Sequence, residues 1–129
     1  MALDGRFVIQ RRFDGTENFN RKWKEYENGF GDVNGEHWLG NKWIHQMTSS
    51  ANYKLRIELW DPAIGHRYAE YTKFVVGDSA SKYKLTVDGY SGNAGNGLKY
   101  KNKKKFTTID NNNSYFSKTC VSAFGGWWY

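Results

Sequence analysis

Tyr53-Lys54-Leu55-Arg56-Ile57-Glu58-Leu59-Trp60-Asp61 is the stretch of sequence that decides the fold class. Every second residue from Tyr53 to Leu59 is apolar and the residues between them are polar. This period of two is typical of a β-strand that buries one face. The stretch therefore predicts a half-buried strand in the middle of the chain.

Turn residues and two further strand-like segments follow directly. Pro62 and Gly65 interrupt the pattern, and the segments from Arg67 to Val76 and from Tyr83 to Tyr90 are again typical of strands. The connection from Asp61 to Arg67 is short enough for a hairpin between antiparallel neighbours. We therefore expect a central antiparallel sheet, with another short strand from Phe7 to Gln10.

Two helices are expected before this sheet. Asn18 is a candidate N-cap, apolar residues follow at spacings of four and three, and Gly29 is a C-terminal stop, so the segment from Asn18 to Gly29 predicts a short amphipathic helix. The segment from Asn41 to Met47 predicts a second one, too short to be stable without packing. Sheet and helices together indicate an α+β fold.

Length and composition bound the rest of the organisation. The 129 residues fit one domain, and aromatic residues make up 18% of them, so we expect an aromatic core. No apolar run reaches the roughly 18 residues that a membrane span needs. The start from Met1 to Gly5 has no signal-peptide pattern. The small, polar stretches 91–96 and 110–114 predict a C-terminal third rich in loops.

Positive charge is concentrated in one short segment. The formal net charge is +6, and five lysines fall within seven positions, namely Lys99, Lys101, Lys103, Lys104 and Lys105. Such a run is more often a solvated loop than a binding site, and the alternative is a site for a polyanion such as a heparin-like glycan. Steep salt dependence of binding would distinguish the second reading from the first.

Catalytic motifs are not evident. His37, His45 and His66 lie in separate segments without the spacing of a zinc-protease helix, and the chain has no GxSxG, P-loop or CxxC pattern. We therefore expect no enzyme. A hydrolase built on Cys120 or on the histidines stays as the opposing hypothesis, which loss of turnover in Cys120→Ala would support.

Several blocks of the sequence resemble the fibrinogen C-terminal domain, in the order and spacing of that family and closest to its fibrinogen-like and fibroleukin-type members. These blocks are Val8–Gly15, Asn18–Trp23, Tyr26–Gly31, Gly35–Asn41, Tyr68–Tyr71, Tyr83–Leu85, Gly92–Gly95, Phe106–Thr108 and Gly125–Tyr129. The resemblance implies a twisted antiparallel sheet flanked by short helices, over about residues 4–90. Residues 91–129 would begin a loop-rich subdomain for ligand and calcium.

The resemblance also implies a function. Members of the family are secreted, non-enzymatic recognition modules that bind glycans, acetylated groups or protein receptors, some in innate immunity or cell signalling. We expect the same of this chain, as a lectin-like domain without nucleic acid or a membrane span. The candidate ligand-binding residues are those of the C-terminal block and its approach, namely Ala123, Phe124, Trp127, Trp128 and Tyr129. Aromatic clusters are more often part of a core or its rim, which is the alternative for Trp127, Trp128 and Tyr129.

A calcium loop is implied at residues 110–120. The family's two ligating aspartates correspond to Asn112 and Ser114, its two ligating carbonyls to Phe116 and Lys118, and the retained Asp110 is not usually a direct ligand. Calcium prefers carboxylate oxygens, so we expect weak binding or none. Asn112 also begins the sequon Asn112-Asn113-Ser114, a candidate glycosylation site that would occlude the ion.

The resemblance further implies that the domain is incomplete. The family continues beyond the aromatic block to a cysteine that bridges to the position of Cys120, which would leave this thiol unpaired and able to form intermolecular dimers. A missing N-terminal region is a second route to an oligomer. Most of the family's ligand pocket, and a strand that returns to the main sheet, also follow that block. We therefore expect an open groove beside Leu55, Ile57 and Leu59, and binding that a C-terminal extension would strengthen. Tight binding by the chain alone would favour the surface around Arg11, Arg12 or Trp38, or the lysine run.

Overall fold

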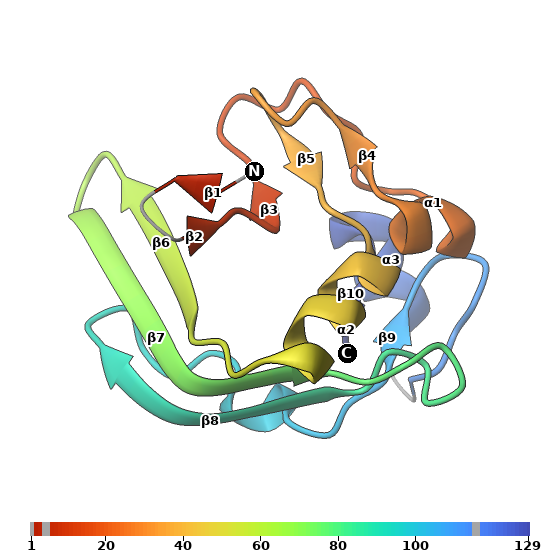
Figure 1. The fold of residues 1–129 in the computed structure, drawn as a ribbon. Coiled ribbons are helices and arrows are strands. Elements are labelled where there is room, and N and C mark those ends of the chain that lie inside the picture. Colours follow the sequence, from red (N-terminus) through yellow and green to blue (C-terminus); the bar gives the residue numbers. More distant parts are fainter. Residues whose placement is uncertain (1, 4–5, 115–116) are drawn as a thin grey trace.

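The computed structural model describes residues 2, 3, 6–114 and 117–129 (Figure 1). These described residues form four small sheets, three α-helices and one hydrophobic core, so the predicted α+β class is confirmed. The elements in chain order are β1 (Ala2–Leu3), β2 (Arg6–Phe7), β3 (Gln10–Arg11), α1 (Trp23–Asn28), β4 (Phe30–Gly31), β5 (His37–Trp38), α2 (Asn41–Ser50), β6 (Leu55–Asp61), β7 (Gly65–Val76), β8 (Leu85–Gly92), the 3₁₀ turn η1 (Lys99–Lys101), β9 (Phe106–Thr107), α3 (Ser117–Phe124) and β10 (Trp127–Trp128).

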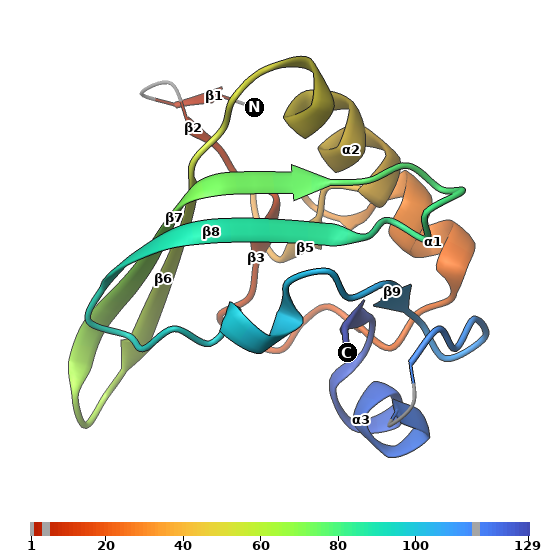
Figure 2. The ribbon, with the colours of Figure 1, turned by 90° about the horizontal axis from the view of Figure 1, so that it is seen from below.

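The main sheet is the predicted antiparallel one, in the order β6-β7-β8. β6 and β7 form the predicted hairpin, in which Ile57 faces Ala69 and Asp61 faces Gly65. β8 begins at Leu85, two residues later than expected, because the φ values of Lys82 and Tyr83, 61° and 52°, are in the left-handed region rather than the extended one. Figure 2 shows β7 and β8 running side by side and curving along their length.

The N-terminal part differs from the prediction in two places. The expected strand from Phe7 to Gln10 is divided, since β2 pairs with β1 whereas β3 pairs with β5. The chain changes partners at Ile9, whose carbonyl oxygen accepts a hydrogen bond from the N–H of Leu39 at 2.8 Å. A second sheet has three strands, in the order β3-β5-β4, and the sequence pattern did not indicate it.

Helix α1 is shorter than the predicted helix from Asn18 to Gly29. Asn18 is not its N-cap, because its side-chain oxygen accepts a hydrogen bond from the N–H of Asn20 in a local turn. The first N–H of the helix, at Trp23, instead donates to the carboxylate of Asp110 at 2.8 Å. Gly29 does end the helix, with a φ of 92°.

Helix α2 packs on β7 and runs three residues beyond the predicted end at Met47. The hydroxyl of Thr48 accepts a hydrogen bond from the N–H of Val76 at 3.0 Å, and the ring of His45 is 2.9 Å from the carbonyl oxygen of Val76. These bonds tie the last turn of α2 to the end of β7. They supply the packing that so short a helix needs.

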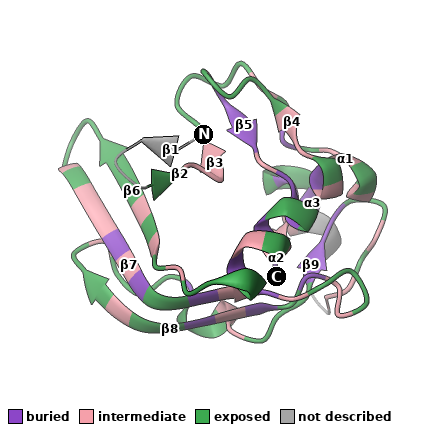
Figure 3. Cartoon of the chain, viewed as in Figure 1, coloured by how far each residue is buried: buried purple, intermediate pink, exposed green. Residues whose placement is uncertain are grey.

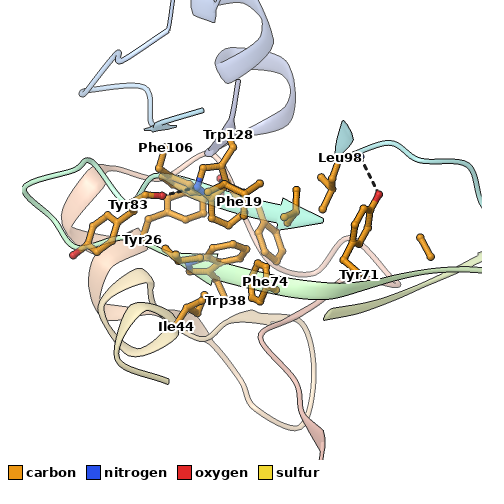
Figure 4. Close-up of a cluster of buried hydrophobic side chains, with 14 residues drawn as sticks. Phe19, Tyr26, Trp38, Ile44, Tyr71, Phe74, Tyr83, Leu98, Phe106 and Trp128 are labelled. Atoms are coloured by element: carbon orange, nitrogen blue, oxygen red, sulfur yellow. Dashed lines mark hydrogen bonds between the residues drawn. The ribbon is translucent and has the colours of Figure 1, made fainter. Parts of the chain in front are cut away.

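The core is aromatic, as the composition predicted. Tyr26, Trp38, Phe106 and Trp128 are each at most 2% exposed and pack with ring centroids 5.1 to 6.2 Å apart (Figure 4). Edge-to-face and tilted ring pairs of this kind add to the free energy gained from apolar burial. Figure 3 shows the buried residues gathered where α1, α2, β5 and β9 meet the ends of β7 and β8.

Candidate functional site

The C-terminal strand β10 buries one of its two tryptophans fully and the other only in part. β10 pairs antiparallel with β9, so consecutive side chains point to opposite faces. Trp128 is 2% exposed, and its indole N–H donates to the carbonyl oxygen of Tyr83 at 2.7 Å (Figure 4). Trp127 is half-buried and stacks edge-on against Trp128, with centroids 5.0 Å apart.

Two glycines let this segment approach α1 closely. A Cβ on Gly126 would lie 2.8 Å from the ring of Tyr26, and one on Gly125 would lie 2.4 Å from the carbonyl oxygen of Phe19. Gly125 also has a φ of 88°, a conformation that disfavours other residues. The doublet therefore allows the aromatic block to dock against the N-terminal part of the chain.

This docking forms a surface hollow of about 330 Å³, which we name the C-terminal hollow. Its lining comes from both ends of the chain and comprises Gln10, Arg12, Tyr26, Phe124, Gly126, Trp127 and Tyr129. Arg12 is part of this lining, and its guanidinium lies 4.1 Å from the ring centroid of Phe19, a buried residue outside the lining. The hollow thus offers aromatic surface, one cation and a few hydrogen-bonding groups.

The phenols of the hollow are held in their neutral form. Burial raises the pKa of Tyr26 to about 12, and burial is also the main cause that raises the pKa of Tyr129. Tyr129 donates its hydroxyl hydrogen to the carbonyl oxygen of Gly125 at 2.6 Å. Both phenols are therefore uncharged near pH 7, and Arg12 is the charged group of the lining.

The predicted ligand-binding residues fall into three places. Phe124, Trp127 and Tyr129 line the hollow, whereas Trp128 belongs to the core and Ala123 is exposed on α3 outside the lining. Gln10 and Arg12 were not among the predicted site residues, although Arg12 belonged to the surface that tight binding by the chain alone would favour. The sequence indicated Arg12 only through its place in the block Val8–Gly15, which resembles the family. Sequence spacing cannot show that Arg12 lies close to residues near position 127.

A second hollow of about 310 Å³ lies against α2. Its lining is mainly apolar and comprises Phe7, Val8, Leu39, Trp43, Gln46, Met47, Ser50 and Tyr53. It offers no charged side chain to orient a ligand. We therefore take the C-terminal hollow as the candidate site and the α2 hollow as its alternative.

In the loop that the resemblance implies as a calcium site, polar side chains form hydrogen bonds with the protein's own groups. The carboxylate of Asp110 accepts hydrogen bonds from the N–H of Trp23 and the hydroxyl of Thr108, both at 2.8 Å, and these bonds help to lower its pKa although burial acts against them. The side-chain oxygen of Asn112 accepts from the N–H of Ser114 at 3.0 Å. Phe116 lies outside the described residues, and Lys118 belongs to α3. Neutral oxygens at Asn112 and Ser114 fit calcium poorly.

The remaining chemistry-bearing residues lie apart. The described side chains contain no cluster of three histidine, cysteine, aspartate or glutamate residues that could hold a metal. His37 is buried against the carbonyl oxygens of Val8 and Gly35, and His66 contacts Glu58. Cys120 is a half-buried free thiol. No described helix has the length and hydrophobicity needed to span a membrane.

Comparison with known proteins places these features in a family. The model of the C-terminal globular domain of fibrinogen beta and gamma chains matches residues 2–129. Fibrinogen-like protein A of Apostichopus parvimensis is 49% identical over 126 residues, which are 95% of this chain and 45% of that protein. The chain therefore spans about half the length of this relative.

Solved structures agree with the family assignment. The fibrinogen-like globe domain of human ANGPTL2 matches with a TM-score of 0.90 at 41% identity, over 95% of this chain and 57% of that one. Lamprey fibrin D-dimer, solved with the peptide Gly-His-Arg-Pro-amide, matches with a TM-score of 0.84 at 35% identity, over 94% and 44% of the two chains. The fold is thus that of a fibrinogen-like globe, a class of non-enzymatic domains, which confirms the prediction of no enzyme. The chain belongs to the family of fibrinogen C-terminal globular domains.

Proposed function

We propose that this chain is the recognition part of a secreted protein and that it binds a glycan, an acetylated group or a protein receptor through the C-terminal hollow. One observation carries the proposal. Arg12, Trp127 and Tyr129 come from opposite ends of the chain and line the same hollow. Aromatic rings that line a surface hollow together with a cation are typical of ligand-binding sites.

The lining suggests which ligand groups fit. The rings of Phe124 and Trp127 offer a face for a methyl group or for the apolar face of a sugar, and Phe124 is 68% exposed. The guanidinium of Arg12 can donate to a carbonyl or carboxylate oxygen beside them. An acetyl amide or an acidic side chain of a receptor combines both features.

The family supports the proposal at a coarser level. Its members include fibrinogen-like proteins, and a relative with the same fold, lamprey fibrin D-dimer, was solved with a peptide ligand. The secreted location, and roles in immunity or signalling, are carried over from the family as part of the proposal. The hollow is near the lower end of ligand-site volumes, so we expect a modest affinity, with Kd roughly between 10 μM and 1 mM.

A binding array tests the proposal. The chain is applied, with and without calcium, to N-acetylated sugars, N-acetylated peptides and receptor ectodomains, beside the variants Arg12→Gln and Trp127→Ala. We expect a subset of spots that both variants lose and that persist without calcium. An array on which the wild-type chain gives no signal above Trp127→Ala would contradict the proposal.

A further inference from the structure

Backbone hydrogen bonds attach the end of the lysine run to the chain at the start of β8. The N–H of Leu85 donates to the carbonyl oxygen of Lys104 at 2.9 Å, and the N–H of Lys103 donates to the carbonyl oxygen of Leu85 at 2.7 Å. The N–H of Phe106 donates to the carbonyl oxygen of Lys82 at 2.9 Å. Residues 82–85 and 103–106 therefore lie antiparallel and side by side, and Figure 2 shows this part of the chain running along β8.

This pairing brings together lysines that are distant in sequence. Lys82 and Lys84 lie on one segment, and the five lysines of the run lie on and beside the other. Backbones joined by hydrogen bonds of this kind lie about 5 Å apart, so the long side chains of both segments can reach one ligand. We name these seven lysines the basic surface.

The charge of the basic surface is open to solvent. Lys84, Lys99 and Lys103–Lys105 are exposed, and none of the seven lysines forms an ion pair with another residue whose side chain the structure describes. Two acidic residues that contact the neighbouring Ser81 and Tyr83 have other partners: the carboxylate of Asp78 accepts from the N–H of Ser81, and that of Glu27 accepts from the hydroxyl of Tyr83 and forms an ion pair with Lys24. The positive charge is thus not neutralised locally.

Backbone strain marks the same place. Across the described part of the chain, the non-glycine residues with positive φ are Lys82, Tyr83 and Lys103, at 61°, 52° and 70°. Glycine would adopt this conformation at a lower cost. Strained residues that the surrounding structure enforces cluster at functional sites. Here the hydrogen bonds between the two lysine segments enforce these conformations, so the backbone that carries the lysines is ordered before any ligand binds.

We propose that the basic surface is a composite site for a sulfated polysaccharide, in which Lys82 and Lys84 bind together with the lysine run. Ammonium groups match sulfates as point charges, and a linear chain of sulfates can follow a ridge formed by two adjacent segments. Prior ordering of the backbone of both segments reduces the entropy lost on binding. This site goes beyond the C-terminal hollow, and it reaches the edge of that hollow where the ammonium of Lys101 lies 5.9 Å from the ring centroid of Tyr129.

Nucleic acid is the competing polyanion, and the composition of the surface argues against it. All seven cations are lysines, whereas arginine provides the planar fork used for bidentate contacts to phosphates and bases. One exposed aromatic residue, Tyr100, lies within the run, whereas binding of single strands relies on successive bases stacking on several rings. A sulfated polysaccharide needs neither feature.

Heparin affinity tests the composite site. We expect the wild-type chain to elute from heparin above about 0.15 M NaCl, the physiological ionic strength. Lys82→Gln/Lys84→Gln should raise the Kd for heparin on the order of tenfold and weaken its salt dependence, as should Lys103→Gln/Lys104→Gln/Lys105→Gln. The control Lys42→Gln/Lys54→Gln removes the same charge as the first variant from lysines elsewhere, and should bind like the wild type. Thermal melting confirms that each variant is folded.

Three outcomes would overturn the inference. The first is elution of the wild type below physiological salt. The second is a folded Lys82→Gln/Lys84→Gln variant that binds heparin no more weakly than the Lys42→Gln/Lys54→Gln control, since the site would then not be composite. The third is tighter binding of a single-stranded oligothymidylate than of heparin at the same salt concentration, which would identify nucleic acid as the ligand. Loss of binding on desulfation of heparin is the result that we expect.

Discussion

The backbone N–H of Gly126 donates a hydrogen bond to the hydroxyl of Tyr26 at 3.1 Å, across 100 positions of the chain. The same hydroxyl donates to the carbonyl oxygen of Phe19. Tyr26 is 1% exposed, so water cannot replace either bond. This one phenol therefore joins α1, the segment before it and the C-terminal block that walls the hollow.

Tyr26→Phe should destabilise the protein without leaving a large cavity. It leaves the N–H of Gly126 without its acceptor, which costs about 1–3 kcal/mol. We expect a melting temperature several degrees lower, measured by circular dichroism. A variant that melts with the wild type would show that the hydroxyl contributes little.

Alkaline pH provides a second readout of the same substitution. Because burial raises the pKa of Tyr26 from 10 to about 12, its contribution is fully present below pH 10 and is lost as the pH rises toward 12. The difference in unfolding free energy between wild type and Tyr26→Phe should therefore shrink between pH 10 and 12. A difference that stays constant over this window would contradict the assigned role of burial.

Glu36 should stabilise the loop beside Arg12. Its side chain accepts hydrogen bonds from the N–H groups of Asp14, Gly15 and Glu17 at 2.9 to 3.1 Å, and from that of Phe13 as well. These backbone bonds, that from Glu17 first, lower the pKa of Glu36 to about 2. Its contribution is therefore present above the unfolded pKa of about 4.5 and is lost as the pH falls through about 2.

Glu36→Gln should consequently lower the melting temperature at pH 7 and flatten the acid dependence of stability between pH 4.5 and 2. The amide replaces one acceptor oxygen with donor hydrogens, which face backbone N–H groups. Glu58→Gln is a suitable control, since the Glu58 side chain is 50% exposed and lies in β6. Equal effects of the two substitutions would argue against a special role for Glu36.

Calcium should have little effect on stability. The implied ligand positions carry neutral Asn112 and Ser114, and the carboxylate of Asp110 already binds Trp23 and Thr108. A ligand present at 100 times its Kd would stabilise by ~2.7 kcal/mol. We expect no clear shift of the melting temperature in about 1 mM calcium, and a larger response in Asn112→Asp/Ser114→Asp. A marked shift in the wild type would contradict this expectation.

The outer edge of β6 should promote self-association. Within the described part of the chain β6 pairs only with β7, and Leu59, a residue of β6, is 53% exposed. An unpaired edge with apolar side chains favours edge-to-edge pairing. Leu59→Lys should lower the weight-average mass in sedimentation velocity at high concentration, whereas the control Val33→Lys, at a residue 55% exposed in a turn, should not. Monomeric wild type at all concentrations would exclude this mode of association.

Local pattern predicted the main sheet well, because each strand signal lay within one segment. The alternation around Ile57 identified β6 and its hairpin, and only strand ends shifted, for example where Tyr83 has a φ of 52°. The N-terminus of α1 could not be predicted, because Asp110 binds it from 87 positions away. The sequence pattern also could not show which tryptophan of the C-terminal aromatic block is buried. The pairing of β10 with β9 places Trp128 in the core and Trp127 at the hollow.

The candidate site depends on the same kind of long-range contact. Phe124, Trp127 and Tyr129 were predicted from the family likeness, but their meeting with Arg12 follows from the close approach that Gly125 and Gly126 permit. Likewise, the lysine run was evident in the sequence, whereas its pairing with Lys82 needed the backbone hydrogen bonds of the fold.

Isothermal titration of the strongest array ligand tests the central claim most directly. The wild type is compared with Trp127→Ala and with the matched control Trp43→Ala, a tryptophan that is 46% exposed and lines the α2 hollow. We expect Trp127→Ala to weaken binding on the order of tenfold or more, equivalent to about 1.4 kcal/mol, and Trp43→Ala to leave the Kd unchanged. Unchanged affinity in a folded Trp127→Ala variant, above all together with a loss in Trp43→Ala, would contradict the assignment of recognition to the C-terminal hollow.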